Sequence, residues 1–176
     1  MTIRERIHGR RVSLAPLRVD HAETWAAWMN DPDTVRYLFP PGGEPRSGFT
    51  AAEELGWGRR ALADPRRVMV AIEERESGRL IGHARLTPLG GQRASFGIVI
   101  GERDQRGRGR GREATALICR YALEELGVRE VVLDVDPRNE AAIRAYVAVG
   151  FEQTRPDRMR LRSPLPPEAE QLLAAG

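Results

Sequence analysis

The sequence feature that most constrains the fold is a run of alternating arginine and glycine, Arg106–Gly111, between two apolar segments. The segment before it, residues 94–100, is rich in β-branched side chains and predicts a strand. The segment after it repeats apolar residues at helical spacing from Ala114 to Ala122. A glycine-rich loop between a strand and a helix lets a ligand approach the backbone, and the free N–H groups of the helix start attract phosphate. This order of elements therefore predicts a cradle for a pyrophosphate group.

Other ligand-binding motifs fit this run less well. A P-loop requires Gly-Lys followed by Ser or Thr, and the chain contains no lysine. The dinucleotide-binding fingerprint requires the spacing G-x-G-x-x-G, whereas these glycines recur at every second position. An arginine–glycine segment that binds nucleic acid is a third hypothesis. That hypothesis is weakened because the run is short and lies between a strand and a helix.

A second strand followed by a helix lies downstream of the first. Residues 131–135 predict the strand, and Asn139 is the expected N-cap of a helix that ends at Gly150. On these two units the sequence resembles the GNAT superfamily of acetyl-CoA-dependent N-acetyltransferases. Residues 106–111 match its pyrophosphate signature, Gln/Arg-x-x-Gly-x-Gly/Ala, and residues 139–151 match its second signature, Asn-x-x-Ala-x-x-x-Tyr-x-x-x-Gly-Phe.

The resemblance extends over roughly residues 10–162 and implies an α/β GNAT fold with a mixed, partly open, twisted sheet. Six to seven strands are expected, with helices on both faces. We expect one domain over residues 1–162 and a C-terminal tail, residues 163–176, that leaves it. Residue patterns elsewhere predict strands at 10–19, 67–74, 80–87 and 151–162 and helices at 20–30, 35–38 and 50–63.

Composition and charge restrict the class of protein. With 41% hydrophobic and 30% charged residues in a chain of 176, the composition is that of a folded domain. Five arginines fall at 103–112 against three acids at 102–113, which suits a polyanionic cofactor as well as a solvated loop. No apolar run reaches the ~18 residues of a membrane span and no signal-peptide core is present, so we expect a cytoplasmic protein. The single Cys119 forms no internal disulfide and is interpreted as a packing residue.

The resemblance implies acetyl-CoA as co-substrate and no metal. The amides of its pantetheine arm would pair with an exposed strand edge, as a peptide does, and Asn139 would bind the arm from the other side. The residues expected at the phosphates are Arg106, Gly107, Arg108, Gly109, Arg110 and Gly111, and those at the strand edge are Ile98, Val99 and Ile100.

Acetyl transfer to an amine also requires an acid for the leaving thiolate and a base for the amine. Tyr146 shares a helix face with Asn139 at i, i+7 and is the expected acid. For the base, Asp134 lies five residues before Asn139, where ribosomal-protein alanine acetyltransferases carry a glutamate; it is equally well interpreted as an ion-pair residue. Glu102, at the exit of the preceding strand, competes with it, His83 is a third candidate, and a bound water is another.

The first part of the chain indicates which class of acceptor is expected and which residues would line its pocket. Its W-x-x-W and N-D-P motifs, at residues 25–28 and 30–32, resemble the GNAT branch that acetylates ribosomal-protein N-termini, polyamines or aminoglycosides. In that branch the segment between the first two strands shapes the acceptor pocket, so Tyr37, Phe39 and Trp57 are expected to line it.

We therefore expect an N-acetyltransferase that acts by direct transfer in a ternary complex. Its acceptor would be a small-molecule amine or a peptide N-terminus, with no specific nucleic acid and no membrane as partner, and it would be a monomer or homodimer. The alternative is a catalytically silent GNAT-fold module that binds acetyl-CoA or a partner.

Overall fold

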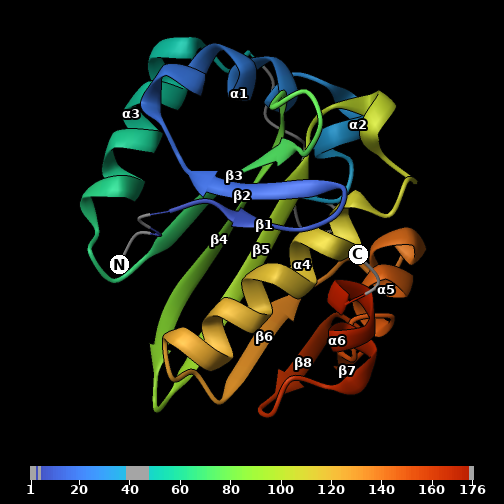
Figure 1. Ribbon diagram of the computed structural model, residues 1–176. Helices are drawn as coiled ribbons and strands as arrows, with labels where there is room; N and C mark the ends of the chain where they lie inside the picture. Colours follow the sequence, from blue (N-terminus) through green and yellow to red (C-terminus); the bar gives the residue numbers. More distant parts are fainter. Residues whose placement is uncertain (1–2, 4, 39–47, 175–176) are drawn as a thin grey trace.

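The computed structural model describes residues 3, 5–38 and 48–174 of the chain. In this part, eight strands form a single sheet in the order β1-β2-β3-β4-β5-β6-β8-β7 (Figure 1). Every neighbouring pair is antiparallel except β5 and β6. The strands are β1 (Ile7–His8), β2 (Val12–Pro16), β3 (Val68–Glu74), β4 (Leu80–Gly90), β5 (Arg93–Ile100), β6 (Glu130–Asp134), β7 (Glu152–Arg155) and β8 (Arg158–Arg162).

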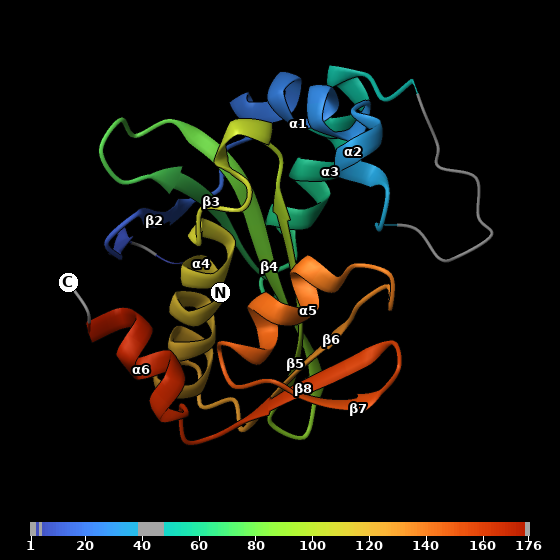
Figure 2. The same ribbon diagram turned by 90° about the vertical axis from the view of Figure 1, so that its right-hand side faces the viewer.

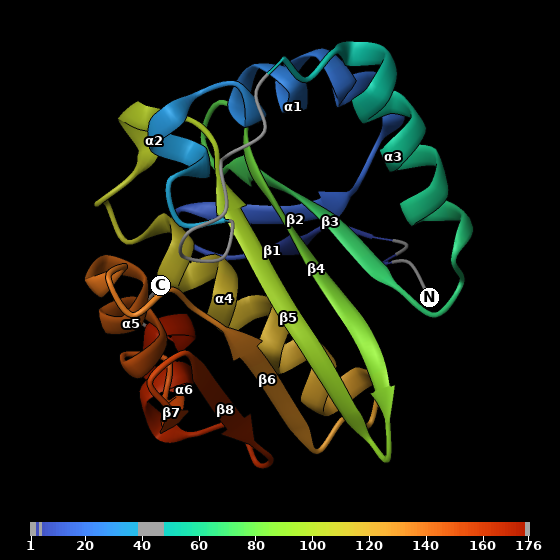
Figure 3. The same ribbon diagram turned by 180° about the vertical axis from the view of Figure 1, so that it is seen from behind.

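The two parallel strands, β5 and β6, separate soon after they begin. They pair only through Arg93–Ser95 of β5 and residues 130–132 of β6. β5 continues to Ile100 while still paired with β4 on its other side. Beyond Ser95 the backbone on the β6 side of β5 therefore has no strand partner within the described residues, and Figure 3 shows the two strands diverging. This opening creates the exposed strand edge that the sequence predicts.

Helices cover both faces of the sheet (Figure 1). On one face, α1 (Ala22–Met29) and α3 (Ala51–Ala63) enclose a small core with residues of β2 and β3. On the other, α4 (Arg110–Arg120), prolonged by the π-helical turn η3 (Tyr121–Glu125), forms the larger core. The remaining helical elements are η1 (Val19–His21), α2 (Pro32–Val35), η2 (Arg103–Gln105), α5 (Glu140–Val147) and α6 (Pro167–Ala174). None of the described helices has the length and apolar character needed to cross a membrane.

The sheet has one strand more than the largest number expected. Two residues, Ile7–His8, are too few to produce a recognisable alternation, so the sequence does not reveal β1. The single strand expected at 151–162 is instead the hairpin β7–β8, which turns at Pro156 and Asp157. Proline lacks the N–H that a continuous hydrogen-bond ladder between strands needs. Pro156 followed by Asp157 was therefore the signal in the sequence for this turn.

The C-terminal segment also differs from its expected position. The tail was expected to leave the domain, but over residues 163–174 it folds back and α6 packs against α4 (Figure 2). Leu165 and Ala169 are 6% and 0% exposed and belong to the larger core. Burial of these apolar side chains holds the segment on the domain.

Candidate functional site

A cleft of about 660 Å³ lies where β5 diverges from β6. Its walls come from the edge of β5, the arginine–glycine loop, the start of α4, the inner side of α5 and the region of α2. Ten residues singled out from the sequence line it: Tyr37, Ile98, Val99, Ile100, Arg106, Gly107, Gly109, Gly111, Asn139 and Tyr146. The fold thus brings the expected acid and all the expected cofactor residues except Arg108 and Arg110 to one place.

The arginine–glycine loop turns into α4 through left-handed backbone. Gly107 and Gly109 have φ angles of 71° and 78°, a region that side-chain-bearing residues rarely adopt, and Gly109 is the N-cap of α4. A Cβ on Gly111 would lie 3.3 Å from Cγ1 of Ile100, so the first turn of α4 rests directly on β5. The unpaired N–H groups of the helix start therefore border the cleft.

Two arginines of the run are used to hold the loop. The guanidinium of Arg106 donates from Nε to the carbonyl of Ile100 over 2.9 Å and from Nη2 to the carbonyl of Gly101 over 2.7 Å. Arg110 forms an ion pair with Glu74 at the end of β3 and is largely buried. Arg106 therefore borders the cleft, but its guanidinium is already hydrogen-bonded to backbone carbonyls of the protein. The side chain of Arg110 does not line the cleft.

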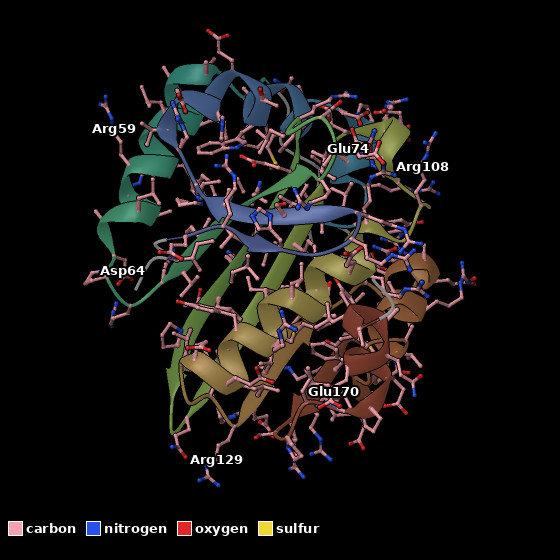
Figure 4. The ribbon with its side chains drawn as sticks, viewed as in Figure 1. Arg59, Asp64, Glu74, Arg108, Arg129 and Glu170 are labelled. Carbon is pink, nitrogen blue, oxygen red and sulfur yellow. The ribbon has the colours of Figure 1, made fainter. Side chains whose placement is uncertain are left out.

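The remaining arginines differ in position. Arg108 is exposed and is not among the residues that line the cleft, and Figure 4 shows it at the periphery of the molecule. Arg112, in the first turn of α4, lines the cleft together with Thr115 and Arg144. The sequence includes Arg112 only among the five arginines that suit a polyanionic cofactor, and it predicts no role for Thr115 or Arg144. Thr115 lies at helical spacing from Gly111 and could have been predicted from it. Arg144 does not lie at helical spacing from Asn139 or Tyr146, so those residues did not indicate it.

Asn139 is the N-cap of α5, as expected. Its Oδ1 accepts a hydrogen bond of 3.1 Å from the backbone N–H of Ala142. Because the side-chain oxygen is used by the helix, the Nδ2 amide group is the part of Asn139 that can donate to a ligand in the cleft.

Tyr146 lies two turns further along α5 and lines the same cleft. Its ring packs edge-on against Phe96 at 6.3 Å and against Phe151 at 5.8 Å. Burial raises the pKa of its hydroxyl to about 12. Tyr146 therefore remains protonated throughout the neutral range, in the form that donates a hydrogen bond.

The structure brings neither carboxylate expected as the base into this cleft. Asp134 ends β6 with its side chain 68% exposed, and its Oδ1 pairs with Nε of Arg158 at 2.8 Å. Oε1 of Glu102 accepts a 2.8 Å hydrogen bond from Nε1 of Trp28, and Oε2 pairs with Arg79. Glu102 lines a separate, shallower cleft beside α1. Asp134 thus has the ion-pair role that the sequence left open.

The expected acceptor residues are dispersed. Tyr37 lines the cleft, whereas Phe39 lies outside the described residues. Trp57 packs in the small core, with ring centroids 5.6 Å from Trp25 and 5.7 Å from His83. Its place on the α1/α3 face is separate from the lining of the cleft.

Cys119 is fully buried, and burial raises the pKa of its thiol, which confirms the packing interpretation. Within residues 3, 5–38 and 48–174, no three His, Cys, Asp or Glu side chains are grouped so that they could hold a metal ion.

Comparison with known proteins gives a consistent result. The family described as "Acetyltransferase (GNAT) domain" matches residues 11–152. A mycothiol acetyltransferase of Kocuria rhizophila is 34% identical in a match of 101 residues that covers 54% of this chain and 33% of that protein. The chain therefore spans about a third of the length of this relative.

Solved structures agree in fold. RimJ of Mycobacterium smegmatis, in complex with CoA-disulfide, superimposes with a TM-score of 0.82 at 16% identity, over 98% of this chain and 95% of that one. A spermidine N-acetyltransferase of Vibrio cholerae, in complex with CoA and spermine, gives a TM-score of 0.72 at 21% identity, over 88% and 97%. At these identities the likeness establishes the fold.

Proposed function

The chain belongs to the GNAT acetyltransferase family, and from this we propose that it transfers the acetyl group of acetyl-CoA directly to a primary amine within a ternary complex. The observation that carries the proposal is the convergence of four features on one cleft. These are the start of α4, the unpaired edge of β5, the amide of Asn139 and the hydroxyl of Tyr146.

The residues present fit coenzyme A. Its diphosphate carries negative charge, and the start of α4 supplies N–H donors and the positive end of a helix dipole. The loop leaves room for it, because a Cβ built on Gly107 would meet no atom within 4 Å. Arg112 adds a cation that lines the cleft. Arg106 contributes by fixing the exit of β5.

The edge of β5 beyond Ser95 offers backbone N–H and C=O groups on the side that faces the cleft. The pantetheine arm carries amides that pair with such an edge, in the manner of an added strand. Asn139 donates from its side-chain amide on the opposite wall. Val99 and Tyr146 also line the cleft, and the thioester would lie near them.

The co-substrate supplies an acetyl group activated as a thioester. As the amine nitrogen bonds to the acetyl carbon and the C–S bond breaks, Tyr146 donates its hydroxyl hydrogen to the departing sulfur, and the proton that the nitrogen loses on becoming an amide restores the phenol by way of solvent. Its raised pKa keeps that hydrogen in place until the sulfur becomes negative. Proximity within the cleft supplies much of the remaining acceleration.

Small-molecule amines and peptide N-termini are the proposed acceptor classes. The test is to measure free thiol released from acetyl-CoA when spermidine, kanamycin or a peptide with an N-terminal alanine is added. We expect release with at least one of them. A protein that binds acetyl-CoA and releases no thiol with any of the three would instead be the catalytically silent module.

A further inference from the structure

The side chain of Arg106 joins two walls of the cleft. Its Nε and Nη2 donate to the carbonyls of Ile100 and Gly101, where β5 ends, and Nη2 also donates to Oγ1 of Thr34 in α2 over 2.5 Å. The side chain is 29% exposed, so these contacts are partly shielded from water. Figure 3 shows α2 beside the segment that follows β5. One guanidinium therefore connects the α2 wall of the cleft with the end of the strand edge proposed to bind the pantetheine arm.

The helix α2 depends on such contacts because it is short. Its four residues, Pro32–Val35, are too few to form a stable helix by themselves. The N-cap, Asp31, accepts from the hydroxyl of Thr34 over 2.7 Å. Arg103 donates to the same carboxylate from Nε over 3.2 Å and also from Nη2. The segment after β5 thus holds α2 through both Arg103 and Arg106.

The charges that line the cleft are divided between its walls. Of the described residues that line it, Asp33 on α2 carries the only carboxylate. Arg112 and Arg144 lie on the walls formed by α4 and α5. These cationic walls suit the phosphates of coenzyme A, whereas the carboxylate suits an ammonium group. An amine acceptor is therefore attracted to the α2 wall.

The carboxylate of Asp33 is accessible to a ligand. Its side chain is 58% exposed, and Nη1 of Arg103 lies 3.0 Å from Oδ2. Such an exposed pair contributes little to stability by itself, so the carboxylate is free to accept from a second cation. Because Arg103 and Arg106 both hold α2, they fix the position of this carboxylate in the cleft.

We propose that Arg106 is a positioning residue for the acceptor: by holding α2 at the end of β5, it places the carboxylate of Asp33 where it binds the acceptor's ammonium group. The inference rests on the proposed function and deepens it, because it gives a cationic acceptor a place in the cleft. From the sequence, Arg106 was expected at the phosphates of coenzyme A. Its bonds to α2 and β5 give it a part in acceptor binding.

Thr34→Val tests the connection, with Thr154→Val as matched control. The first variant keeps the β-branched shape, removes the oxygen that accepts from Arg106, and leaves the bonds of Arg106 to β5 in place. Thr154 lies in β7, is not among the residues that line the cleft, and donates to the carbonyl of Arg158 over 3.2 Å. With whichever of spermidine, kanamycin or the alanine peptide the wild type acetylates, we expect Thr34→Val to raise the acceptor KM about tenfold and to change kcat by less than about twofold. Thr154→Val should match the wild type.

Calorimetry with acetyl-CoA separates the two sides of the cleft. The Kd of acetyl-CoA should stay within about twofold of wild type in Thr34→Val, because the start of α4 and the edge of β5 are untouched. An unchanged acceptor KM would overturn the inference. A loss of acetyl-CoA affinity as large as the rise in that KM would overturn it as well, because α2 would then serve the cofactor.

Two variants of Arg106 separate positioning from phosphate binding. Lysine keeps the charge that attracts a phosphate but lacks the planar fork that reaches α2 and β5 together, and glutamine lacks the charge. We expect both variants to raise the acceptor KM about tenfold and to bind acetyl-CoA with affinities within about twofold of each other. Acetyl-CoA affinity that is lost in Arg106→Gln and retained in Arg106→Lys would overturn the inference, because Arg106 would then be a phosphate ligand.

Asp33→Asn tests the proposed partner of the ammonium group. We expect the acceptor KM to rise about tenfold, and added salt to raise that KM less in the variant than in wild type, since salt screens an attraction that the variant lacks. In the Asp33→Asn background, Thr34→Val should raise the KM less than it does alone, because it acts through Asp33. An unchanged KM in Asp33→Asn, or fully additive effects of the two substitutions, would contradict the proposal.

A second readout does not depend on turnover. In α2 the N–H groups of Thr34 and Val35 donate to the carbonyl of Asp31 over 3.0 Å and 3.1 Å. We expect their hydrogen exchange, measured by NMR without ligand, to be about tenfold faster in Arg106→Gln than in wild type. Exchange of the N–H of Ala142, at the start of α5, should be unchanged. Equal exchange in α2 of the two proteins would overturn the inference, whereas failure of thiol release alone would overturn the proposed function.

Discussion

Tyr146 lies two turns beyond Asn139 on α5, and both side chains line the cleft that the edge of β5 and the start of α4 also border. The side-chain oxygen of Asn139 caps the helix by accepting from Ala142, so its side-chain NH2 group is left to donate to a ligand. The same helix carries Tyr146, the phenol that we propose as the proton donor to the sulfur. One short helix therefore connects cofactor binding with the chemical step.

Replacement of Tyr146 by phenylalanine tests that step. Because the ring contacts with Phe96 and Phe151 are retained, we expect the fold and the affinity for acetyl-CoA to be unchanged. Turnover should fall by about 10²–10⁴-fold, the loss expected for a missing general acid. Steady-state kinetics and calorimetry check this, and equal turnover in variant and wild type would make Tyr146 a packing residue.

Replacement of Gly109 by alanine tests the cradle. A Cβ in the left-handed region costs about 1–2 kcal/mol, and here the strain falls on the loop that we propose to hold the phosphates. We expect the affinity for acetyl-CoA, measured by calorimetry, to fall about tenfold or more. Gly78→Ala is the control, because Gly78 has a φ of 68° in the β3–β4 hairpin, away from the cleft. Equal affinity in both variants would make the loop only a connector.

The two carboxylates predicted from the sequence should prove dispensable. Asp134→Asn removes the ion pair with Arg158 at an exposed site, where such pairs contribute little. Glu102→Gln keeps an oxygen that can accept from Trp28. We expect turnover of both variants to stay within about threefold of wild type and their pH profiles to overlay it. A large loss at neutral pH in either one would restore that carboxylate as the base.

Parts of the site are predictable because they are local in sequence. The turn at Gly109 and the spacing from Asn139 to Tyr146 each lie within one loop or one helix. The ion pair between Asp134 and Arg158 depends instead on the register of β6 and β8, which residue patterns do not specify.

The same limit applies to longer-range assemblies. The aromatic group around His83 draws on α1, α3 and β4, three elements far apart in the chain. In the sequence Trp25 and Trp28 stand out only as the two ends of the W-x-x-W motif. Their contact with His83, which lines neither described cleft, follows only from how the helices pack on the sheet.

Acid should weaken the fold through His83. Its pKa in the folded protein is about 4, against an ordinary value of about 6.5 in the unfolded chain. Below pH 6.5 the unfolded chain binds a proton that the folded protein does not, so stability falls as pH drops from about 6.5 toward 4. Burial lowers the pKa of His21 in the same direction.

Urea unfolding measures this effect. We expect the free energy of unfolding to fall by about 1–2 kcal/mol between pH 7 and pH 5 through His83. His83→Gln should show a smaller fall over the same interval. Identical pH dependence in the variant and the wild type would mean that His83 is not neutralised by burial.

Direct transfer is the central claim, and the mass of the protein tests it most directly. Purified protein is incubated with acetyl-CoA alone and then with an acceptor amine, while intact mass and free thiol are followed together. The account predicts an unmodified protein and no thiol before the amine is added, and then one thiol released for each amine acetylated. An acetylated protein, or a burst of thiol without an acceptor, would contradict it.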